Sequence, residues 1–279
     1  MKIAVHTLVK NEARFVWFSV MSVIDYVDRV LLWDTGSSDG TREILKEIKK
    51  RSPGKVDLKF LEEVNVESFR DVRQAMLDAT REDWFLVVDG DEVWWDRSIA
   101  QVTDFIRSEG DDFESVVVPT VNLVGDIYHY QEESAGHYRL AGRVGHLNLR
   151  GVNRKIPGLK SDKPHGTWGW VDGSGKMIQD RDQRKIRFFD ASYMHASFLR
   201  RSSARGGDLE VPKRDKKLKH EIGLSFPADY FYPEVFFRER PEIVASPWER
   251  MNTLFYLRSV VETPLRKFKR RVLPVKEGY

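Results

Sequence analysis

Acidic side chains of this chain gather in two short stretches that could bind a metal ion. One reads Asp-Thr-Gly-Ser-Ser-Asp-Gly-Thr from Asp34 to Thr41, and the other reads Asp-Gly-Asp-Glu from Asp89 to Glu92. Carboxylate oxygens are the ligands that Mg²⁺ and Mn²⁺ prefer, and an ion held by one or two carboxylates keeps positions for phosphate oxygens. Carboxylates that lie close together repel one another unless a cation or hydrogen-bond donors compensate them. The two stretches therefore predict a divalent-metal site for a phosphate-bearing ligand, provided that the fold brings them together.

Each stretch by itself has a simpler explanation. Asp, Gly and Ser are common turn residues, so the first stretch could be a turn that caps a helix, and the second could be a surface turn. Gly90 would let backbone or a ligand approach closely, because glycine has no side chain. The metal hypothesis thus depends on whether both stretches follow strands of one sheet.

Short apolar runs alternate with helix-like segments through the first 125 residues. The expected strands cover residues 3–9, 30–33, 56–61, 84–88 and 115–119, and the expected helices cover residues 12–26, 41–50 and 68–80, with another from Ser98. Strands that alternate with helices form a mostly parallel sheet flanked by helices, and the strands then end at one edge, where ligands bind. We therefore predict an α/β fold with both acidic stretches at that edge.

The pattern changes after about Asp126, where polar, glycine and aromatic residues are mixed. We expect ligand-binding loops there, and a strand at 191–198 that returns to the sheet. A polar, mobile segment should follow at 200–220, and a helix at 248–261. The chain would divide into a first half at 1–125 that carries both acidic stretches, a second half of the same domain at 126–220, and a basic helical extension at 221–279.

Two further motifs accompany the acidic stretches. Lys10-Asn11-Glu12 follows the first expected strand, and Arg73-Gln74 lies in the third expected helix. In this order and approximate spacing, the four motifs resemble those of the family 2 glycosyltransferases, which have the GT-A fold. The resemblance is strong over the first 125 residues and faint afterwards. It implies that residues 1–125 are the donor-binding half and residues 126–220 the acceptor-side half. The family usually has Arg-Asn where this chain has Arg73-Gln74.

The resemblance implies a metal-dependent, inverting transfer of a sugar from a nucleotide diphosphate, most simply a UDP-sugar. The acceptor would be a hydroxyl of a glycan, a lipid-linked sugar or a cell-surface polysaccharide. The metal would be Mn²⁺ or Mg²⁺, acting as a Lewis acid on the departing diphosphate. Donor contacts fall by position on Thr7, Glu12, Asp34, Arg73 and Asp89, and metal ligation falls on Asp89, Asp91 and His195.

The general base that takes the acceptor proton should come from the second half of the chain. The candidates are Asp162, His165, Asp172, Glu132 and Glu133. Gly166 stands where many relatives have a glutamate after a histidine, so no single base is chosen. Trp168 and Trp170 could stack on a sugar ring or belong to the core.

Other functions explain fewer of these residues. A non-catalytic nucleotide-sugar-binding scaffold would share the fold, but the intact acidic motifs favour an enzyme. Asp34-Thr35-Gly36-Ser37 also matches the catalytic letters of aspartic proteases. Those enzymes need a second such aspartate that shares a proton, and they are all-β. A dehydrogenase would need a glycine-rich turn after the first strand, where Lys10-Asn11-Glu12 stands instead.

The charge of the chain is divided between its halves. Residues 1–125 hold 16 basic and 24 acidic side chains, and residues 126–279 hold 30 and 19, so the net +3 is the sum of −8 and +11. The basic half should attract a phosphate-bearing or membrane-borne acceptor. Residues 200–219 and 266–271 are expected to be solvated surface, and the alternative is that they attract anionic lipid or a lipid-phosphate acceptor. No nucleic-acid-binding motif accompanies the charge.

The chain has no cysteine, which excludes disulfides and thiolate zinc sites. We expect a cytoplasmic protein without a membrane span, peripheral at most on the inner face of the membrane.

Overall fold

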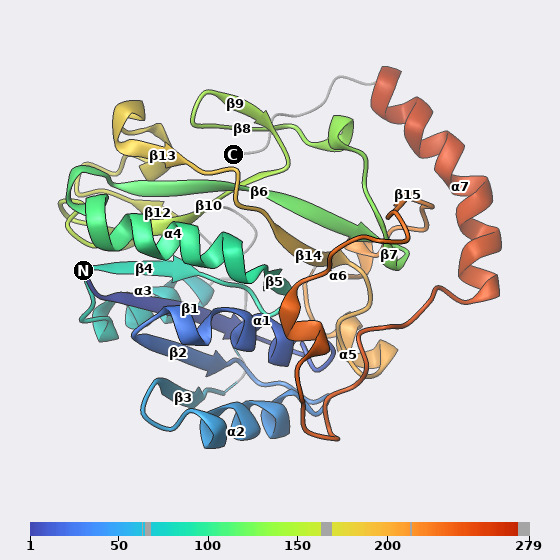
Figure 1. Cartoon of the computed structure of the whole chain (residues 1–279), viewed down its shortest axis with the longest axis horizontal. Helices are drawn as coiled ribbons and strands as arrows, with labels where there is room; N and C mark the ends of the chain where they lie inside the picture. The colour runs from blue at the N-terminus through green and yellow to red at the C-terminus, as the bar shows by residue number, and fades with distance from the viewer. Residues whose placement is uncertain (63, 65–67, 163–168, 213, 273–279) are drawn as a thin grey trace.

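The computed structural model describes residues 1–62, 64, 68–162, 169–212 and 214–272. Its centre is a mixed sheet in the order β15-β7-β6-β10-β4-β1-β2-β3. Four neighbouring strands of the first half are parallel, and Figure 1 shows them with helices on both sides. They are β1 (Ile3–Val9), β2 (Arg29–Asp34), β3 (Val56–Phe60) and β4 (Trp84–Val87).

The helices of the first half cover the two faces of the sheet unequally. One apolar core contains α1 (Val16–Val23), α2 (Thr41–Arg51) and α4 (Asp96–Glu109). The other face packs against α3 (Phe69–Ala79). Successive side chains of a strand point to opposite faces, so both faces of these strands are covered by apolar side chains. The predicted α/β fold is confirmed.

The first helix is shorter than the sequence predicted. It begins at Val16 rather than at residue 12, and a 3₁₀ turn, η1 (Ile24–Tyr26), ends it. Asn11 has φ 55°, a left-handed conformation, and residues 12–15 form a turn before the helix. The prediction rested on the high proportion of apolar residues in this segment, and it therefore placed the start of the helix four residues too early.

The second half adds antiparallel strands, which corrects the expectation that every strand ends at one edge. β10 (Leu147–Asn153) lies between β4 and β6 (Ser115–Val124) and is antiparallel to both. β7 (Asp126–Tyr130) and β15 (Leu224–Ser225) extend the sheet beyond β6. Residues 126–220, expected as loops, thus form part of the central sheet.

The strand expected at 191–198 is present as β14 (Tyr193–Phe198). It is parallel to β6 and antiparallel to β5 (Glu92–Trp94), and His195 is paired with Glu92. The remaining short strands are β8 (Tyr138–Leu140), β9 (Arg143–Gly145), β11 (Lys160–Ser161), β12 (Trp170–Val171) and β13 (Ile186–Phe188). β14 is the element that brings the second half to the acidic motif after β4.

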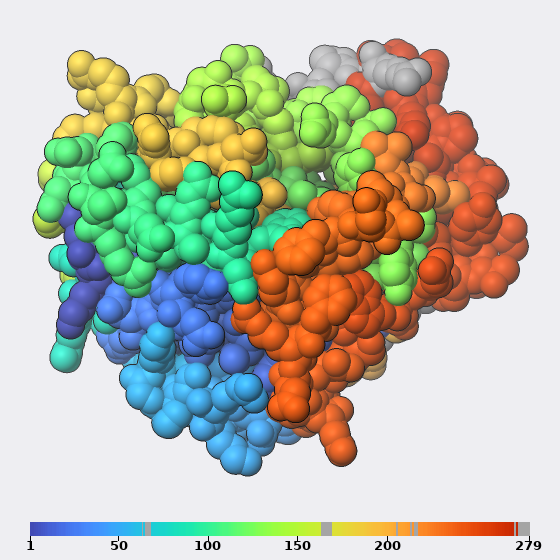
Figure 2. Space-filling model, in the orientation of Figure 1, coloured from blue at the N-terminus to red at the C-terminus, as the bar shows by residue number. Residues whose placement is uncertain are grey.

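The chain after residue 220 first returns to the donor half and then leaves it. η6 (Glu234–Phe237) packs on α1, where the rings of Phe236 and Phe18 lie 5.2 Å apart. In Figure 2 this orange segment crosses the face of the first half, and α7 (Thr253–Val272) forms the side of the molecule. Within the described residues, no helix is long and apolar enough to cross a membrane.

Candidate active site

The two acidic stretches meet at one edge of the sheet, as the sequence predicted. Asp34 ends β2 in register with Val9 of β1, and the Asp89–Glu92 loop follows β4, which lies on the other side of β1. The backbone oxygen of Asp91 accepts a hydrogen bond from the Ala196 nitrogen of β14 at 2.9 Å. Both stretches therefore follow parallel strands that flank β1, and β14 is joined to the second stretch.

Asp34 is fully buried and organises its own turn. Its carboxylate accepts hydrogen bonds from the backbone nitrogens of Gly36 and Ser37, each at 3.1 Å, and from Nε of Arg42 at 2.8 Å. The turn explanation thus accounts for part of this motif. Its position at the end of β2 is also the position that a donor contact would need.

Asp91 is buried and carries a negative charge that the second half compensates. Its Oδ2 lies 2.5 Å from Nη1 of Arg201 and 3.4 Å from Nε2 of His195. Burial disfavours the charged carboxylate, but the positive charge of Arg201 and the contact with His195 outweigh burial and hold the pKa of Asp91 well below its usual value. Asp91 is therefore a carboxylate that stays ionised in a buried place.

Glu12, of the Lys10-Asn11-Glu12 motif, lies beside the same arginine. Its Oε1 is 3.3 Å from Nη1 of Arg201 and also pairs with Arg214. Burial raises the pKa of Glu12 to about 7, although both arginines oppose that shift. Its other oxygen, Oε2, and the buried hydroxyl of Thr7 have no hydrogen-bond partner among the described residues. A ligand that donates hydrogen bonds could satisfy both atoms.

A second buried charge group supports the loop after β4. Arg150 of β10 pairs with Glu92, and its Nη2 lies 3.4 Å from Oδ2 of Asp89. The Tyr193 hydroxyl donates to Glu92 at 2.9 Å. Burial, followed by the negative charges of Asp89 and Asp91, raises the pKa of Glu92 well above its usual value, and Arg150 opposes the rise. The Asp89 side chain is 46% exposed, so this carboxylate is the accessible one.

The side chains predicted as metal ligands have suitable chemistry. In a site with bonds of about 2.1 Å, neighbouring ligand atoms lie roughly 3 Å apart, and Asp91 Oδ2 and His195 Nε2 are 3.4 Å apart. Within the described part of the chain, however, no three acidic or histidine side chains are arranged to hold an ion together. Asp89 pairs with Arg150 and Asp91 with Arg201, so a bound cation would have to replace at least the Arg201 contact.

The segment from residue 200 to 218 covers this edge, which corrects the expectation of a solvated, mobile stretch. Arg201 and Arg214 are 8% and 5% exposed. Asn11 Nδ2 donates to the Gly207 oxygen at 2.8 Å, and Ser38 Oγ donates to Glu210 at 2.7 Å. The two short helices here are α5 (Arg205–Leu209) and α6 (Arg214–Lys217). Sequence periodicity gave no signal for these arginines, because their partners lie more than a hundred residues away.

The candidate general bases lie in different places. Asp172 accepts hydrogen bonds from Ser174 and from the Lys176 nitrogen and pairs with Arg181, and these contacts lower its pKa to about 2. Arg181 also pairs with Glu114, which precedes β6 at the opposite edge of the sheet. The structure thus places Asp172 in a structural turn away from Asp91.

Asp162 directly follows β11, whose Ser161 nitrogen donates to Gln74 of α3 at 2.8 Å. His165 and Trp168 lie outside the described residues. Glu132 lies 4.0 Å from Arg270 of α7, and Glu133 begins the 3₁₀ turn η3 (Glu133–Ala135). Asp162 is the candidate that the structure joins to the helix carrying the Arg73-Gln74 motif.

Two other predicted residues lie on the face covered by α3. The Arg73 guanidinium stacks 4.6 Å from the centre of the Phe69 ring. Trp170 is buried, with its ring 5.0 Å from that of Phe85. Of the two explanations for Trp170, the structure supports the core one.

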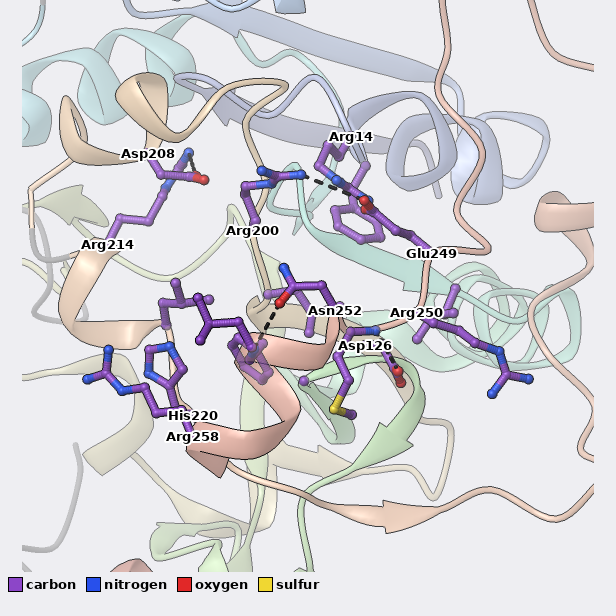
Figure 3. A pocket seen from close by; sticks show the side chains of 18 of the residues that line it. Arg14, Asp126, Arg200, Asp208, Arg214, His220, Glu249, Arg250, Asn252 and Arg258 are labelled. Carbon is purple, nitrogen blue, oxygen red and sulfur yellow. Dashed lines mark hydrogen bonds and ion pairs between the residues drawn. The ribbon is translucent and has the colours of Figure 1, made fainter. Parts of the chain in front are cut away.

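A cavity of about 690 Å³ adjoins the cluster on the side of α7 (Figure 3). Arg214, which pairs with Glu12, also lines this cavity, together with Arg14 and Arg200. Apolar side chains, among them Phe15 and Leu199, complete the wall. The cavity is therefore basic and partly apolar.

Comparisons with solved structures found distant similarities. Among solved structures, S. aureus TarS is 14% identical over 71% of this chain and 37% of that chain, with a TM-score of 0.47. The mannosyltransferase PcManGT from Pyrobaculum calidifontis, in complex with GDP-Man and Mn²⁺, is 16% identical over 75% of this chain and 59% of that chain, with a TM-score of 0.43. This chain thus spans little more than a third of TarS. No curated protein matches it.

The sequence gives the decisive comparison. The family model described as glycosyl transferase family 2 matches residues 4–191, which is more than half of the chain and includes all four motifs. The chain therefore belongs to glycosyl transferase family 2.

Proposed function

We propose that the protein is a metal-dependent, inverting transferase that moves a sugar from a nucleotide diphosphate to an acceptor hydroxyl. The observation that carries the proposal is the convergence of Asp91, Glu12 and His195 beneath two buried arginines. Buried carboxylates are costly unless a cation balances them. A site that already gathers these carboxylates and guanidinium groups has the charges needed for a cation and for a diphosphate.

On the donor side, we assign the nucleoside contact to Asp34 and the lining of its pocket to Thr7, Glu12 and Arg73. Thr7 Oγ1 and Glu12 Oε2, both buried and without a partner in the described chain, support a polar ligand here. UDP is the nucleotide that we would test first.

Asp89, Asp91 and His195 would hold the divalent ion, which supplies positive charge for the departing diphosphate. Asp89 is the exposed member of the set, and its position beside Asp91 would let it share the ion or the ribose. Arg201 and Arg214, once separated from the carboxylates, would be free to pair with phosphate oxygens, for which the guanidinium group is well suited.

Inversion requires a base on the acceptor side that takes the hydroxyl proton. Asp162 is our candidate among the described residues, because β11 and α3 position it. His165 stays a candidate outside them. The basic second half favours an acceptor that carries phosphate or other negative charge, such as a lipid-linked glycan.

Replacement of Asp91 tests the metal assignment. We expect Asp91→Ala to lose Mn²⁺-dependent UDP binding in calorimetry by at least about tenfold, because groups that merely orient a metal ligand already contribute about 10- to 100-fold. Asp104→Ala is the matched control, since the Asp104 side chain is 77% exposed on α4. Equal UDP binding by Asp91→Ala and the native protein would contradict the assignment.

Turnover separates the enzyme from a binding scaffold. A transferase should hydrolyse or transfer from a sugar nucleotide in the presence of Mn²⁺, whereas a scaffold would bind the nucleotide without turnover. A thermal-shift screen of sugar nucleotides with and without Mn²⁺ would identify the donor first, because ligands stabilise the fold in proportion to their affinity.

A further inference from the structure

The last helix, α7 (Thr253–Val272), has its polar face turned toward the protein. Ser259 is fully buried, and the Thr263 hydroxyl accepts a hydrogen bond from the Ile222 nitrogen at 2.8 Å. Arg270 pairs with Glu221 on the same side. The contacts that hold this helix on the protein are therefore largely polar.

The opposite face of α7 is apolar and exposed. Its six apolar side chains are each 58–78% exposed, and they are Leu254, Leu257, Val261, Leu265, Phe268 and Val272. They recur at intervals of three and four residues, which places them on one side of a helix that turns about 100° per residue. Figures 1 and 2 show α7 at the outside of the molecule.

This arrangement is the reverse of an ordinary surface helix, which buries its apolar face and exposes its polar face. A continuous apolar stripe on a protein surface marks a contact with a membrane or another molecule. Because α7 contacts the rest of the protein mainly through its polar face, the apolar stripe does not pack against the fold.

The charge of α7 selects the partner. The helix holds six basic residues and one acidic residue, Glu262, so its net charge is +5. Arg258 and Lys269 border the stripe, and the Arg258 side chain is 61% exposed. Two copies of this helix would repel one another, whereas an anionic membrane attracts basic residues by about 1 kcal/mol each near its surface. Helices with an apolar face bordered by Lys and Arg lie in the membrane interface.

The stripe also meets the basic cavity. Leu254 belongs to the stripe and also lines the cavity. The cavity is lined as well by Arg258, in the same end of α7, and by Arg250, which precedes the helix (Figure 3). We propose that α7 docks the protein on an anionic membrane, with the apolar stripe inserted between lipid head groups and the arginine-lined cavity bordering the bilayer. This inference concerns where the protein works and stands without the proposed metal-dependent transfer.

Vesicle sedimentation tests the proposal. We expect the full chain to sediment with vesicles of phosphatidylcholine and phosphatidylglycerol and to remain largely unbound with phosphatidylcholine alone. The triple variant Leu257→Gln, Val261→Gln, Phe268→Gln should bind anionic vesicles at least about tenfold more weakly, because it removes apolar surface that the membrane would bury. The control makes the same change at exposed apolar residues of other elements: Val144→Gln, Phe231→Gln and Ile243→Gln. Equal loss of binding in the two triple variants would overturn the proposal.

Two further measurements distinguish the stripe from other causes. Since the chain has no cysteine, a single Val261→Cys or Tyr256→Cys can carry an environment-sensitive dye. These positions lie about 140° apart on the helix, so anionic vesicles should shift the emission at residue 261 and leave that at residue 256 nearly unchanged. Equal shifts at both positions would contradict insertion of the stripe. A dimer in analytical ultracentrifugation that the stripe variant dissociates would overturn the proposal in favour of a second copy.

Discussion

Arg201 acts as an internal counterion of Asp91, one of the three residues that we propose as metal ligands. Its Nη1 lies 2.5 Å from Asp91 and 3.3 Å from Glu12, and its side chain is 9% exposed. A buried guanidinium that bridges two carboxylates is stabilising only while both partners remain. A divalent cation at the proposed site would therefore compete with Arg201 for the carboxylate of Asp91.

We predict that Arg201→Met lowers the free energy of unfolding by about 3–5 kcal/mol without added metal, since Asp91 loses its partner in a buried place. Mn²⁺ should then raise the melting temperature of the variant more than that of the native protein. Arg258→Met, at an exposed arginine, is the control. Identical Mn²⁺-induced shifts in native and Arg201→Met proteins would refute the competition.

Asp172 should affect stability rather than turnover. Its folded pKa of about 2 lies below the usual 3.8, so its contribution to stability is present above about 3.8 and is lost as the pH falls through about 2. Asp172→Asn should therefore melt at a lower temperature than the native protein at neutral pH, and the gap should close in acid. In a turnover assay, by contrast, Asp162→Asn should lower kcat while calorimetry shows that UDP binding is kept. A collapse of kcat in Asp172→Asn would restore this residue as a candidate base.

At the scale of elements, the loop after β4 packs tightly against the turn after β1. A Cβ at Gly90 would lie 2.9 Å from both Glu12 Cγ and Val9 Cγ1, closer than real Cβ contacts allow. The sequence predicted that backbone or a ligand approaches Gly90 closely; in the structure the atoms that do so are side-chain carbons of Val9 and of Glu12, in the Lys10-Asn11-Glu12 motif. The glycine keeps the two motifs in contact.

We predict that Gly90→Ala destabilises the protein by about 1–3 kcal/mol through overpacking and weakens UDP binding by displacing Glu12. Gly54→Ala is the control, because a Cβ there meets no atom within 4 Å and the backbone is not left-handed. Urea unfolding and calorimetry measure the two effects. Equal stabilities for the two alanine variants would show that the contact can relax without cost.

At the level of the whole molecule, one apolar core includes residues from Ile3 of β1 to Val244, which lies in the segment between η6 and α7. β10 of the second half lies between β4 and β6, and Phe236 packs on Phe18. We propose that the donor half, the acceptor-side half and residues 221–252 fold together, with only α7 standing apart.

This proposal predicts a single cooperative unfolding transition. Phe236→Ala, at a residue 2% exposed, should lower the stability of the whole transition by about 3–5 kcal/mol. The fragment 1–125 should lack a cooperative transition, because without β10 it leaves an edge of β4 unpaired. Two separate transitions in the full chain would argue for independent parts.

Much of the first half was predictable because its signals are local. Apolar runs of four to seven residues, such as Trp84–Val87, become strands covered on both faces, and the acidic motifs follow them directly. β10 was missed because Leu147–Asn153 mixes polar and apolar residues, and its Arg150 is buried only through its ion pair with Glu92. The burial of Arg201 and Arg214 in residues 200–218 was also missed, because it too depends on ion pairs with distant carboxylates.

The alternating elements, the order of the four motifs and the edge of the sheet that carries both acidic stretches follow from patterns along the chain. The cations that compensate the carboxylates follow from the fold, because Arg150, Arg201 and Arg214 reach their partners across 58, 110 and 202 residues. The fold also decided that α7 turns its apolar face outward. The physical reason is that helix and strand patterns depend on neighbours along the chain, whereas ion pairing and burial depend on distances in space that such patterns do not encode.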